Sequence, residues 1–326
     1  MRKAVAAETR RDDVAEGSGR ETRVRRHAVY GLPPRELVEP AAGAVQLSPL
    51  MPGAEAVEDL RDGSLAGVVM AAPPGTIERR HVLAHLLRAS AAGAVLVAAA
   101  PNDKGGARLA AELAAFGCAP KSESRRHHRI VTARRPEHPA GLDAAIAAGA
   151  ARHDAGLGHW TQPGVFSWDK IDAGSLLLER HLPPLAGRGA DLGCGIGILA
   201  RAALGRSPAV TALHVVDIDR RAVDCARRNV QDPRARFDWA DVRAIAFGAE
   251  GLDFVVTNPP FHDGGAEDRA LGVAFIRRAS EILKRGGRCL LVANRHLPYE
   301  APLGAAFASV RLIAEEGGFK VYEAVR

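Results

Sequence analysis

The chain has 326 residues, enough for two domains that each bury a core of their own. Hydrophobic residues make up 47% of it and charged residues 25%, a globular composition that excludes a fully disordered chain. The net charge of +6 and the pI near 9.4 favour a polyanionic partner.

The four cysteines form no Cys-x-x-Cys pair; they are Cys118, Cys194, Cys225 and Cys289. This spacing argues against a zinc site or a disulfide framework, so we expect reduced thiols and no bound metal. Residues 1–13 carry charges where a signal peptide needs an apolar core, and no stretch reaches the length of a membrane helix. We therefore expect a cytoplasmic protein that does not bind membranes.

Residues 1–28 are rich in arginine and nearly free of periodic apolar residues, which predicts a mobile basic tail. Such a tail either contacts nucleic acid or is a solvated end with no specific role. The sequence leaves both open.

Residues 29–135 are predicted to form a first, smaller domain. Apolar runs at 65–72 and 94–100 indicate buried parallel strands, and residues 77–89 and 107–116 have helical periodicity. This alternation predicts an α/β layer. The domain has no glycine-rich turn followed by an acid, so it has the architecture of a nucleotide-binding domain without the usual binding residues.

The end of this domain, residues 121–135, is strongly basic. It is either a solvated face or a patch that contacts phosphates, and His127 and His128 fit exposed turn or strand-edge positions better than metal ligands. Residues 136–158 are predicted to link the two domains, with a short helix near 142–150.

Residues 159–326 are predicted to form a second domain with a glycine-rich turn near its start. Gly193, Gly195 and Gly197 lie between a strand and a helix and are preceded by Asp191. Glycine lets the backbone turn tightly and approach a ligand without a Cβ collision. This pattern alone is a weak signal, so the residues that follow it decide its meaning.

Acidic residues follow the next two predicted strands. Asp217 lies 20 residues after Gly197, where a carboxylate would hold ribose hydroxyls. Asp219 fits the N-cap of a helix at 220–230. Asp241 ends the third strand.

A fourth strand, residues 254–256, runs into Asn258, Pro259, Pro260 and Phe261. The prolines stop the strand because they cannot donate to a ladder and they fix φ. The resulting rigid corner suits chemistry on a planar amine: the Asn258 oxygen and the Pro259 carbonyl would accept its N–H bonds, and the Phe261 ring would stack on the base. A strand followed by an ordinary turn is the alternative.

The rest of the second domain completes a predicted seven-stranded sheet with helical crossovers. It comprises a helix at 267–284 that stops at Gly286, and strands at 288–293, 311–314 and 319–325. The ligand crevice of such a sheet lies at the carboxyl ends of its strands.

The order of these motifs resembles that of the class I S-adenosylmethionine-dependent methyltransferases. A nicotinamide-dependent dehydrogenase fits less well, because its fingerprint is Gly-x-Gly-x-x-Gly and it gives Asn-Pro-Pro-Phe no role. Further stretches are similar to one family of the class, the bacterial rRNA guanine-N2 methyltransferases of the small-subunit rRNA methyltransferase C type. They are Pro163-Gly-Val-Phe-Ser167, Asp172-x-Gly-Ser175, Asn258-Pro-Pro-Phe-His-Asp-Gly264, Val292-Ala-Asn-Arg-His-Leu-Pro-Tyr299 and Gly318-Phe-Lys-Val-Tyr322.

This resemblance implies an α/β fold in which a Rossmann-like C-terminal methyltransferase domain follows a degenerate methyltransferase-like domain. It implies S-adenosyl-L-methionine as cofactor, and it assigns roles to the motif residues. In the cofactor site, the methionine end would lie against Asp191, Gly193, Gly195 and Gly197, Asp217 would hold the ribose, and Asp241 would lie near the adenine. Phe166 would line the mouth of this site. The target base would be positioned by Asn258, Pro259, Pro260 and Phe261, and Asn258 would also border the cofactor. A structural cap on the glycine turn is the alternative role for Asp191.

The implied activity is methyl transfer to the exocyclic N2 amine of a guanine in rRNA, with 16S rRNA of the small subunit as the expected substrate. Two alternatives stay open. One is an enzyme of the same fold that acts on adenine N6 or on a release-factor glutamine, and the other is a non-catalytic RNA-binding assembly factor. We expect rRNA or the small ribosomal subunit as partner, and a monomer, although the sequence does not fix the oligomeric state.

Overall fold

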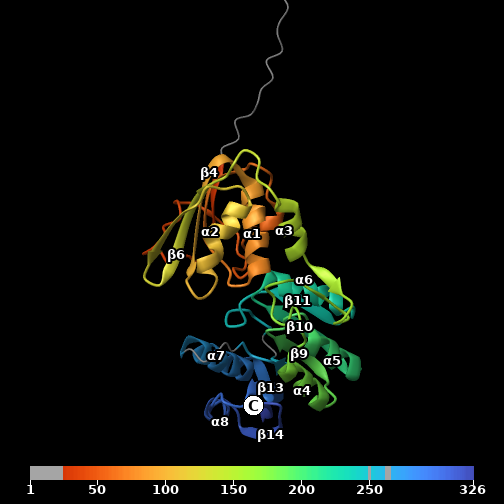
Figure 1. The fold of residues 1–326 in the computed structure, drawn as a ribbon. Coiled ribbons are helices and arrows are strands. Elements are labelled where there is room, and N and C mark those ends of the chain that lie inside the picture. The colour runs from red at the N-terminus through yellow and green to blue at the C-terminus, as the bar shows by residue number, and fades with distance from the viewer. Residues whose placement is uncertain (1–24, 249–250, 261–265) are drawn as a thin grey trace, which may run out of the picture.

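The computed structural model describes residues 25–248, 251–260 and 266–326. Figure 1 shows two domains along the long direction of the molecule, the first (red to yellow) at the top and the second (green to blue) below it. Most of the predicted basic tail, residues 1–24, lies outside the described residues, and the first strand already begins at Arg26.

The first domain contains six strands and three α-helices among its described residues. The strands are β1 (Arg26–Tyr30), β2 (Val45–Gln46), β3 (Leu65–Ala71), β4 (Ser90–Pro101), β5 (Lys121–Arg125) and β6 (His128–Arg134); the helices are α1 (Thr76–Ala89), α2 (Leu109–Ala115) and α3 (Leu142–Gly149), with single-turn helices at Val57–Asp59 and Gly106–Arg108. The sheet order is β2-β1-β3-β4-β6-β5. The first four strands in this order are parallel, and β5 and β6 form an antiparallel hairpin at the edge.

Helix α3 corresponds to the short helix predicted near 142–150 within the linker range, and it packs against the first domain. Ala145 is buried in the core of the first domain, and the His81 imidazole of α1 lies 2.8 Å from the Ile146 carbonyl oxygen. A Cβ at Gly149 would collide with His81, so the glycine lets α3 approach α1 closely. Alanine-rich sequence gives little amphipathic contrast, which is why this packed helix reads as a connection.

The second domain contains nine strands and five α-helices among its described residues. The strands are β7 (Arg152–Asp154), β8 (His159–Thr161), β9 (Gly187–Leu192), β10 (Val210–Asp217), β11 (Ala235–Trp239), β12 (Leu252–Thr257), β13 (Leu283–Asn294), β14 (Ser309–Glu316) and β15 (Phe319–Val325); the helices are α4 (Ala173–His181), α5 (Ile198–Arg206), α6 (Arg220–Asn229), α7 (Ala266–Ile282) and α8 (Glu300–Ala306). Strands β7 and β8 form a separate hairpin, and the other seven form one sheet of order β11-β10-β9-β12-β13-β15-β14. This arrangement confirms the predicted α/β fold class.

The middle of this sheet is buried on both faces. Phe254 and Val256 of β12 pack in the core formed with α4 and α5, whereas Val255 packs with α7 on the opposite face. This explains the continuous apolar run in the sequence, because a parallel strand covered on both sides has no polar face. Helix α7 ends at Ile282, so Gly286 lies within the range of β13 and is not the helix stop that the sequence predicts.

The strand order reverses between β9 and β12, since β10 and β11 lie to one side of them and β13 to the other. In open α/β sheets, ligands bind at such a switch point, outside the carboxyl ends of the strands. The glycine turn follows β9 and Asn258 follows β12, so both lie at this point.

The two sheets repeat the same topology. The order β2-β1-β3-β4-β6-β5 of the first domain corresponds, strand for strand and in direction, to β10-β9-β12-β13-β15-β14 of the second. Strand β3 therefore corresponds to β12. Ala72-Pro73-Pro74 follows β3 just as Asn258-Pro259-Pro260 follows β12, so the first domain has an alanine at the position of the amide.

Candidate active site

Asn258 is held in one orientation by its neighbours. Its side-chain Nδ2 donates to the Asp172 carboxylate at 2.8 Å and lies 2.9 Å from the Ser175 hydroxyl. A carboxylate only accepts hydrogen bonds, so the amide nitrogen must face Asp172 and the oxygen must point away from it. The Asn258 residue is 8% exposed, and its Oδ1 has no hydrogen-bond partner in the described structure. The corner therefore presents a fixed acceptor that no group of the described chain satisfies.

Asp172 connects this amide to the start of α4. Its Oδ2 accepts from the Ser175 backbone N–H at 2.8 Å, so it is the N-cap of the helix as well as the partner of Asn258. The sequence analysis names Asp172-x-Gly-Ser175 only as a family motif and missed this contact. An aspartate three residues before a serine is a capping signal, but it does not indicate which distant amide the carboxylate binds.

The rest of the corner is described only up to Pro260. Pro259 is buried and Pro260 partly buried, and Thr257 donates from Oγ1 to the Leu192 carbonyl oxygen at 2.7 Å. That bond ties the end of β12 to the end of β9. Phe261, predicted to stack on the base, lies outside the described residues and its role stays a prediction.

The three glycines of the turn have positive φ angles of 74°, 52° and 89° at Gly193, Gly195 and Gly197. A Cβ at Gly197 would lie 3.0 Å from Val230, and one at Gly193 would lie 3.3 Å from Phe275, so these two positions allow close packing of helices. A Cβ at Gly195 would meet only Phe166, at 3.9 Å. Gly195 is therefore the glycine whose α-carbon faces the crevice.

Asp217 lies directly under this turn. Its Oδ2 accepts from the Gly195 backbone N–H at 2.8 Å, and its Oδ1 accepts from the Asp219 N–H at 2.9 Å. Burial raises the pKa of the Asp217 carboxyl to about 6. Each oxygen retains capacity for a further hydrogen bond, which a ribose hydroxyl can supply.

Asp191 is fully buried, and no hydrogen bond of normal geometry reaches its carboxylate oxygens among the described residues, although the Ala200 backbone N–H of α5 acts on the carboxylate and lowers its pKa. Burial raises the pKa of this carboxyl to about 8. A structural cap on the glycine turn would accept from the turn's N–H groups, and no such bond is present among the described residues. A buried carboxylate without a charged partner is compatible with a cationic ligand group such as the ammonium of a methionine, and this role of Asp191 stays a prediction.

Phe166 and Ser167 form the outer edge of the crevice. Phe166 is 52% exposed although it is a large aromatic residue, and it lies nearest to Gly195 in the turn. Ser167 has a φ of 62°, a left-handed conformation that a serine adopts only at a cost. Strained backbone of this kind gathers at ligand sites. Both observations agree with the predicted mouth of the cofactor site.

One exposed apolar residue next to Asp217 was not named in the sequence analysis. Ile218, between Asp217 and Asp219, is 39% exposed despite being apolar. The signal in the sequence was the position of Ile218 directly after Asp217, the acid that ends β10. Asp241 is partly exposed and its carboxylate accepts from Arg243 Nε and Nη2, so its predicted contact with adenine stays a prediction.

The first domain contacts this same loop through a buried ionic network. Arg221 donates to both oxygens of Asp219, at 3.0 and 2.8 Å, and to Glu78 Oε1 of α1 at 2.6 Å. All three side chains are buried. The network therefore joins α1 of the first domain to the residue that donates to Asp217.

A second contact between the domains lies beside Ile218. The Pro49 carbonyl oxygen accepts from the Arg220 backbone N–H at 2.9 Å and from Trp239 Nε1 at 3.0 Å. Trp239 Nε1 also lies 2.9 Å from the Ile218 carbonyl oxygen. The loop that holds the predicted ribose and adenine sites is thus braced from outside by the first domain.

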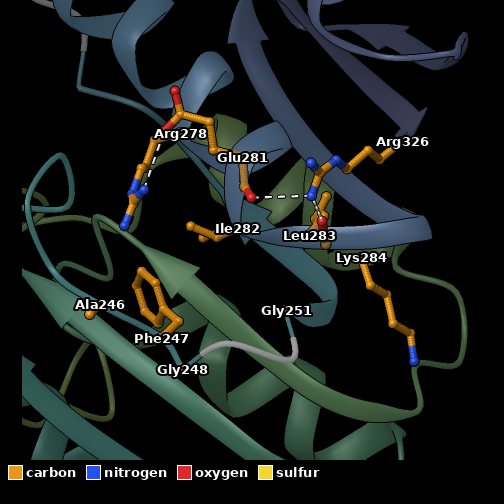
Figure 2. Close-up of a pocket in the computed structure, with 10 residues that line it drawn as sticks. All are labelled: Ala246, Phe247, Gly248, Gly251, Arg278, Glu281, Ile282, Leu283, Lys284 and Arg326. Carbon is orange, nitrogen blue, oxygen red and sulfur yellow. Dashed lines mark hydrogen bonds and ion pairs between the residues drawn. The ribbon is translucent and has the colours of Figure 1, made fainter.

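A cavity of about 610 Å³ opens at the other edge of the same sheet, and Figure 2 shows the residues that line it. Gly251 and Leu283 mark it as lying at the amino ends of β12 and β13, opposite Asn258. Its arginines are already engaged: Arg278 donates to the Val242 carbonyl oxygen, and Arg326 donates to those of Glu281 and Leu283. This cavity is not part of the crevice.

Neither a metal cluster nor a membrane span occurs in the described part of the chain. No group of three or more His, Cys, Asp and Glu side chains there is placed to hold a metal ion. Among the helices within the described ranges, none has both the length and the apolarity needed to cross a membrane.

A glycine turn after the first strand, an acid after the second and an Asn-Pro-Pro corner after the fourth meet at one edge of this sheet. They define a class I S-adenosylmethionine-dependent methyltransferase. The Methyltransferase small domain family matches residues 156–323, just over half of the chain.

Within this class, the chain belongs to the ribosomal RNA small subunit methyltransferase C family. A member from Stutzerimonas stutzeri is 32% identical over 316 residues, covering 91% of this chain and 93% of its own. Members from Hahella chejuensis and Yersinia pestis are 37% and 38% identical, but these alignments cover 51% and 50% of this chain and 49% and 47% of theirs. The chain thus spans about half the length of several curated relatives that it matches.

A solved structure agrees over both domains. The 16S rRNA N2 G1207 methyltransferase of T. thermophilus, in complex with AdoMet and guanosine, superposes with a TM-score of 0.74 at 25% identity. The match covers 93% of this chain and 88% of that one. These comparisons confirm the family and the fold class predicted from the sequence. The individual site residues stay predictions.

Proposed function

We propose that this chain transfers a methyl group from S-adenosylmethionine to the exocyclic N2 amine of a guanine in 16S rRNA. The observation that carries the proposal is the unpartnered, oriented Oδ1 of Asn258 at the carboxyl edge that also holds the glycine turn. The names of the relatives and the guanosine bound to the T. thermophilus enzyme support the choice of base.

The residues of the crevice fit the cofactor. Asp191 would pair with the ammonium of its methionine part, Asp217 would accept from the ribose hydroxyls, and Ile218 would contact the adenine ring. Gly195 leaves room for the backbone to approach it, and Phe166 would cover the mouth. When bound, S-adenosylmethionine supplies a methyl group on a cationic sulfonium, which is the electrophile of the reaction.

The chain's own contribution to the chemistry is position and electrostatics. The N2 amine of guanine is a weak nucleophile because its lone pair is delocalised into the ring. Asn258 Oδ1 and the Pro259 carbonyl oxygen would accept its two N–H bonds and favour a tetrahedral nitrogen. Asp172 and Ser175 hold the amide for this purpose, so Asn258 need not reorganise during the reaction.

The finer points of the proposal concern the partner. The substrate is 16S rRNA, free or within the small subunit, the enzyme acts as a monomer, and a ribosomal substrate places it in the cytoplasm. A guanine inside a duplex would have to be extruded, at a cost of a few kcal/mol.

The test is mass spectrometry of rRNA nucleosides from cells with and without the gene. We expect N2-methylguanosine to be reduced in 16S rRNA of the deletion strain and restored by the wild-type gene, but not by an Asn258→Ala copy. A deletion that changes N6-methyladenosine or release-factor methylation, and leaves N2-methylguanosine intact, would refute the proposed substrate.

A further inference from the structure

The hairpin of β5 and β6 ends in a strained basic turn. Its two connecting residues, Arg126 and His127, have φ angles of 46° and 61°. A two-residue hairpin turn with both φ positive is normally made from Asn-Gly, because side chains with a bulky Cβ disfavour this conformation. Among the described non-glycine residues, only Ser167 shares a positive φ, and it lies at the mouth of the cofactor site. The arginine and histidine therefore occupy the tip against local preference.

The surrounding structure maintains this turn. His128 Nδ1 lies 2.9 Å from the Arg126 carbonyl oxygen, which can only accept, so the imidazole donates to it. The Asn102 backbone N–H donates to the His127 carbonyl oxygen at 2.9 Å. Two bonds thus fix the backbone of both strained residues, and their side chains are left exposed.

The tip is a cluster of cations without ion-pair partners. Arg125 and Arg126 are exposed, and neither they nor the neighbouring Lys104 form an ion pair in the described structure. Arg129, at the base of the tip, has a buried Nε without a hydrogen-bond partner. Many other arginines of the chain, by contrast, are paired with carboxylates, as Arg26 is with Glu55 and Arg180 with Glu316. Unpaired guanidinium groups at an exposed turn are suited to phosphate.

The tip lies on the edge of the first domain that faces the catalytic domain. His128 pairs with Pro101, so the tip is at the carboxyl end of β4. The neighbouring parallel strand β3 ends at the same edge and leads into α1, where Glu78 bonds to Arg221 just past the carboxyl end of β10. The carboxyl edges of the two sheets therefore meet at the domain interface. Figure 1 shows the hairpin (labelled β6) and α7, which follows the Asn-Pro-Pro corner, on the same side of the molecule.

We propose that the hairpin tip, defined as Arg125, Arg126 and His127, is a docking surface for the phosphodiester backbone of the substrate RNA while its target base lies at Asn258. The inference rests on the proposed function for the identity of the RNA. Phosphate contacts of this kind fix the register of a nucleic acid without reading its sequence. An Asn-Gly turn would form the same hairpin without the backbone strain, but it would lack the positive charge of Arg126 that this docking surface requires.

The deciding variant is R126N/H127G, which installs the turn that the backbone prefers. We expect its thermal midpoint to equal or exceed that of the wild type, and its S-adenosylmethionine affinity to be unchanged. Its affinity for a 16S rRNA transcript should fall several-fold, and the slope of log K against log salt should decrease by about 0.7–0.9 for the lost phosphate contact. The KM for RNA should rise and kcat should stay the same. A purely structural role for the tip would not move the salt slope.

The matched control is Arg61→Asn. Arg61 is exposed and precedes β3, at the amino edge of the same sheet. Its substitution therefore removes one positive charge on the side of the first domain that faces away from the catalytic domain. Its RNA affinity should stay at the wild-type value. Wild-type affinity and slope in R126N/H127G, or an equal loss in Arg61→Asn, would overturn the docking surface. These outcomes are independent of the product: a wild-type enzyme that binds the transcript through the tip and methylates no guanine N2 refutes the proposed function alone.

Discussion

The Asn258→Ala variant tests the catalytic corner most directly. The substitution removes the Nδ2 bonds to Asp172 and Ser175 together with the free Oδ1. Asp172 keeps its capping bond from the Ser175 N–H, so α4 still has its N-cap. One bond to a charged acceptor and one to a hydroxyl are lost, and we expect the free energy of unfolding to decrease by about 1–3 kcal/mol. The fold should survive.

Turnover should decrease far more than stability. Deleting one preorganised polar group at a reacting centre reduces kcat by about 10²–10³-fold, or roughly 2.7–4 kcal/mol. Asp191, Gly195 and Asp217 keep all their contacts, so S-adenosylmethionine affinity should stay close to the wild-type value. The assay is single-turnover methylation of the RNA at saturating cofactor, with cofactor affinity measured by calorimetry.

Ser175→Ala provides the matched control. It removes one of the two partners of the Asn258 amide and leaves the Asp172 bond and Oδ1 in place. We expect a similar loss of stability and less than about tenfold loss of rate, since the remaining charged acceptor still orients the amide. An Asn258→Ala enzyme with the normal rate, or a Ser175→Ala enzyme as slow as Asn258→Ala, would refute the assigned role of Oδ1.

Three further substitutions test the cofactor site. Asp217→Ala should weaken S-adenosylmethionine binding by on the order of 1.5–3 kcal/mol, because charge-assisted acceptors of the ribose are lost; calorimetry showing unchanged affinity in a folded variant would move the role to another acid. Burial raises the pKa of Asp191 to about 8, and in the proposed site its ionised form would pair with the ammonium of the cofactor, so cofactor affinity should rise with pH between about 6 and 7.5 and this dependence should vanish in Asp191→Asn. Because that pKa is raised by folding, the carboxyl should also make the free energy of unfolding decrease as pH rises from about 4 to 8, and a denaturant series should show a flatter profile in Asp191→Asn. Glu78→Ala leaves Arg221 paired only with Asp219, and removing one partner of a buried pair costs about 3–5 kcal/mol of stability. We expect several-fold weaker cofactor binding in this variant. An unaltered Kd would show that the domain interface does not support the ribose site.

The strands of the catalytic domain could be predicted from the sequence because burial on both faces leaves a clear apolar run. Strand β12 with its two prolines is the plainest case. The β5 strand, Lys121–Arg125, could not be predicted, since all five residues are exposed and no alternation marks a face. Helix α4 was also missed, although Asp172 at its start is a normal N-cap. Local sequence therefore predicts elements whose apolar side chains are buried in a regular pattern. It does not predict elements such as β5, which form because a neighbouring strand pairs with them.

The candidate site likewise has features that the sequence predicts and features that only the fold shows. The sequence motifs name the candidate site residues, but the contacts that orient them join positions far apart in the chain. Asp172 and Asn258 are 86 residues apart, and Glu78 and Arg221 are 143 residues apart. Only the fold shows that the Asp172 helix cap also holds the Asn258 amide, the predicted catalytic group. It also shows that Gly197 serves packing against α6 and that Gly195 faces the crevice.

The two domains show why the same topology gives chemistry in one and not in the other. At the corner of the first domain, the fully buried Arg79 donates from Nη1 to the Pro73 and Pro74 carbonyl oxygens at 3.0 and 2.8 Å and pairs with Glu112. The Pro73 carbonyl corresponds to that of Pro259, which would accept one N–H bond of the base, so in the first domain a guanidinium already satisfies this acceptor. A Cβ at Gly105 would collide with the same arginine, which means that the space above the corner is filled by protein. In the second domain the corresponding corner has an asparagine in place of alanine, and its Oδ1 has no partner in the described structure. In the proposed function, methyl transfer would therefore fall to the corner of the second domain, and the first domain would support it from outside.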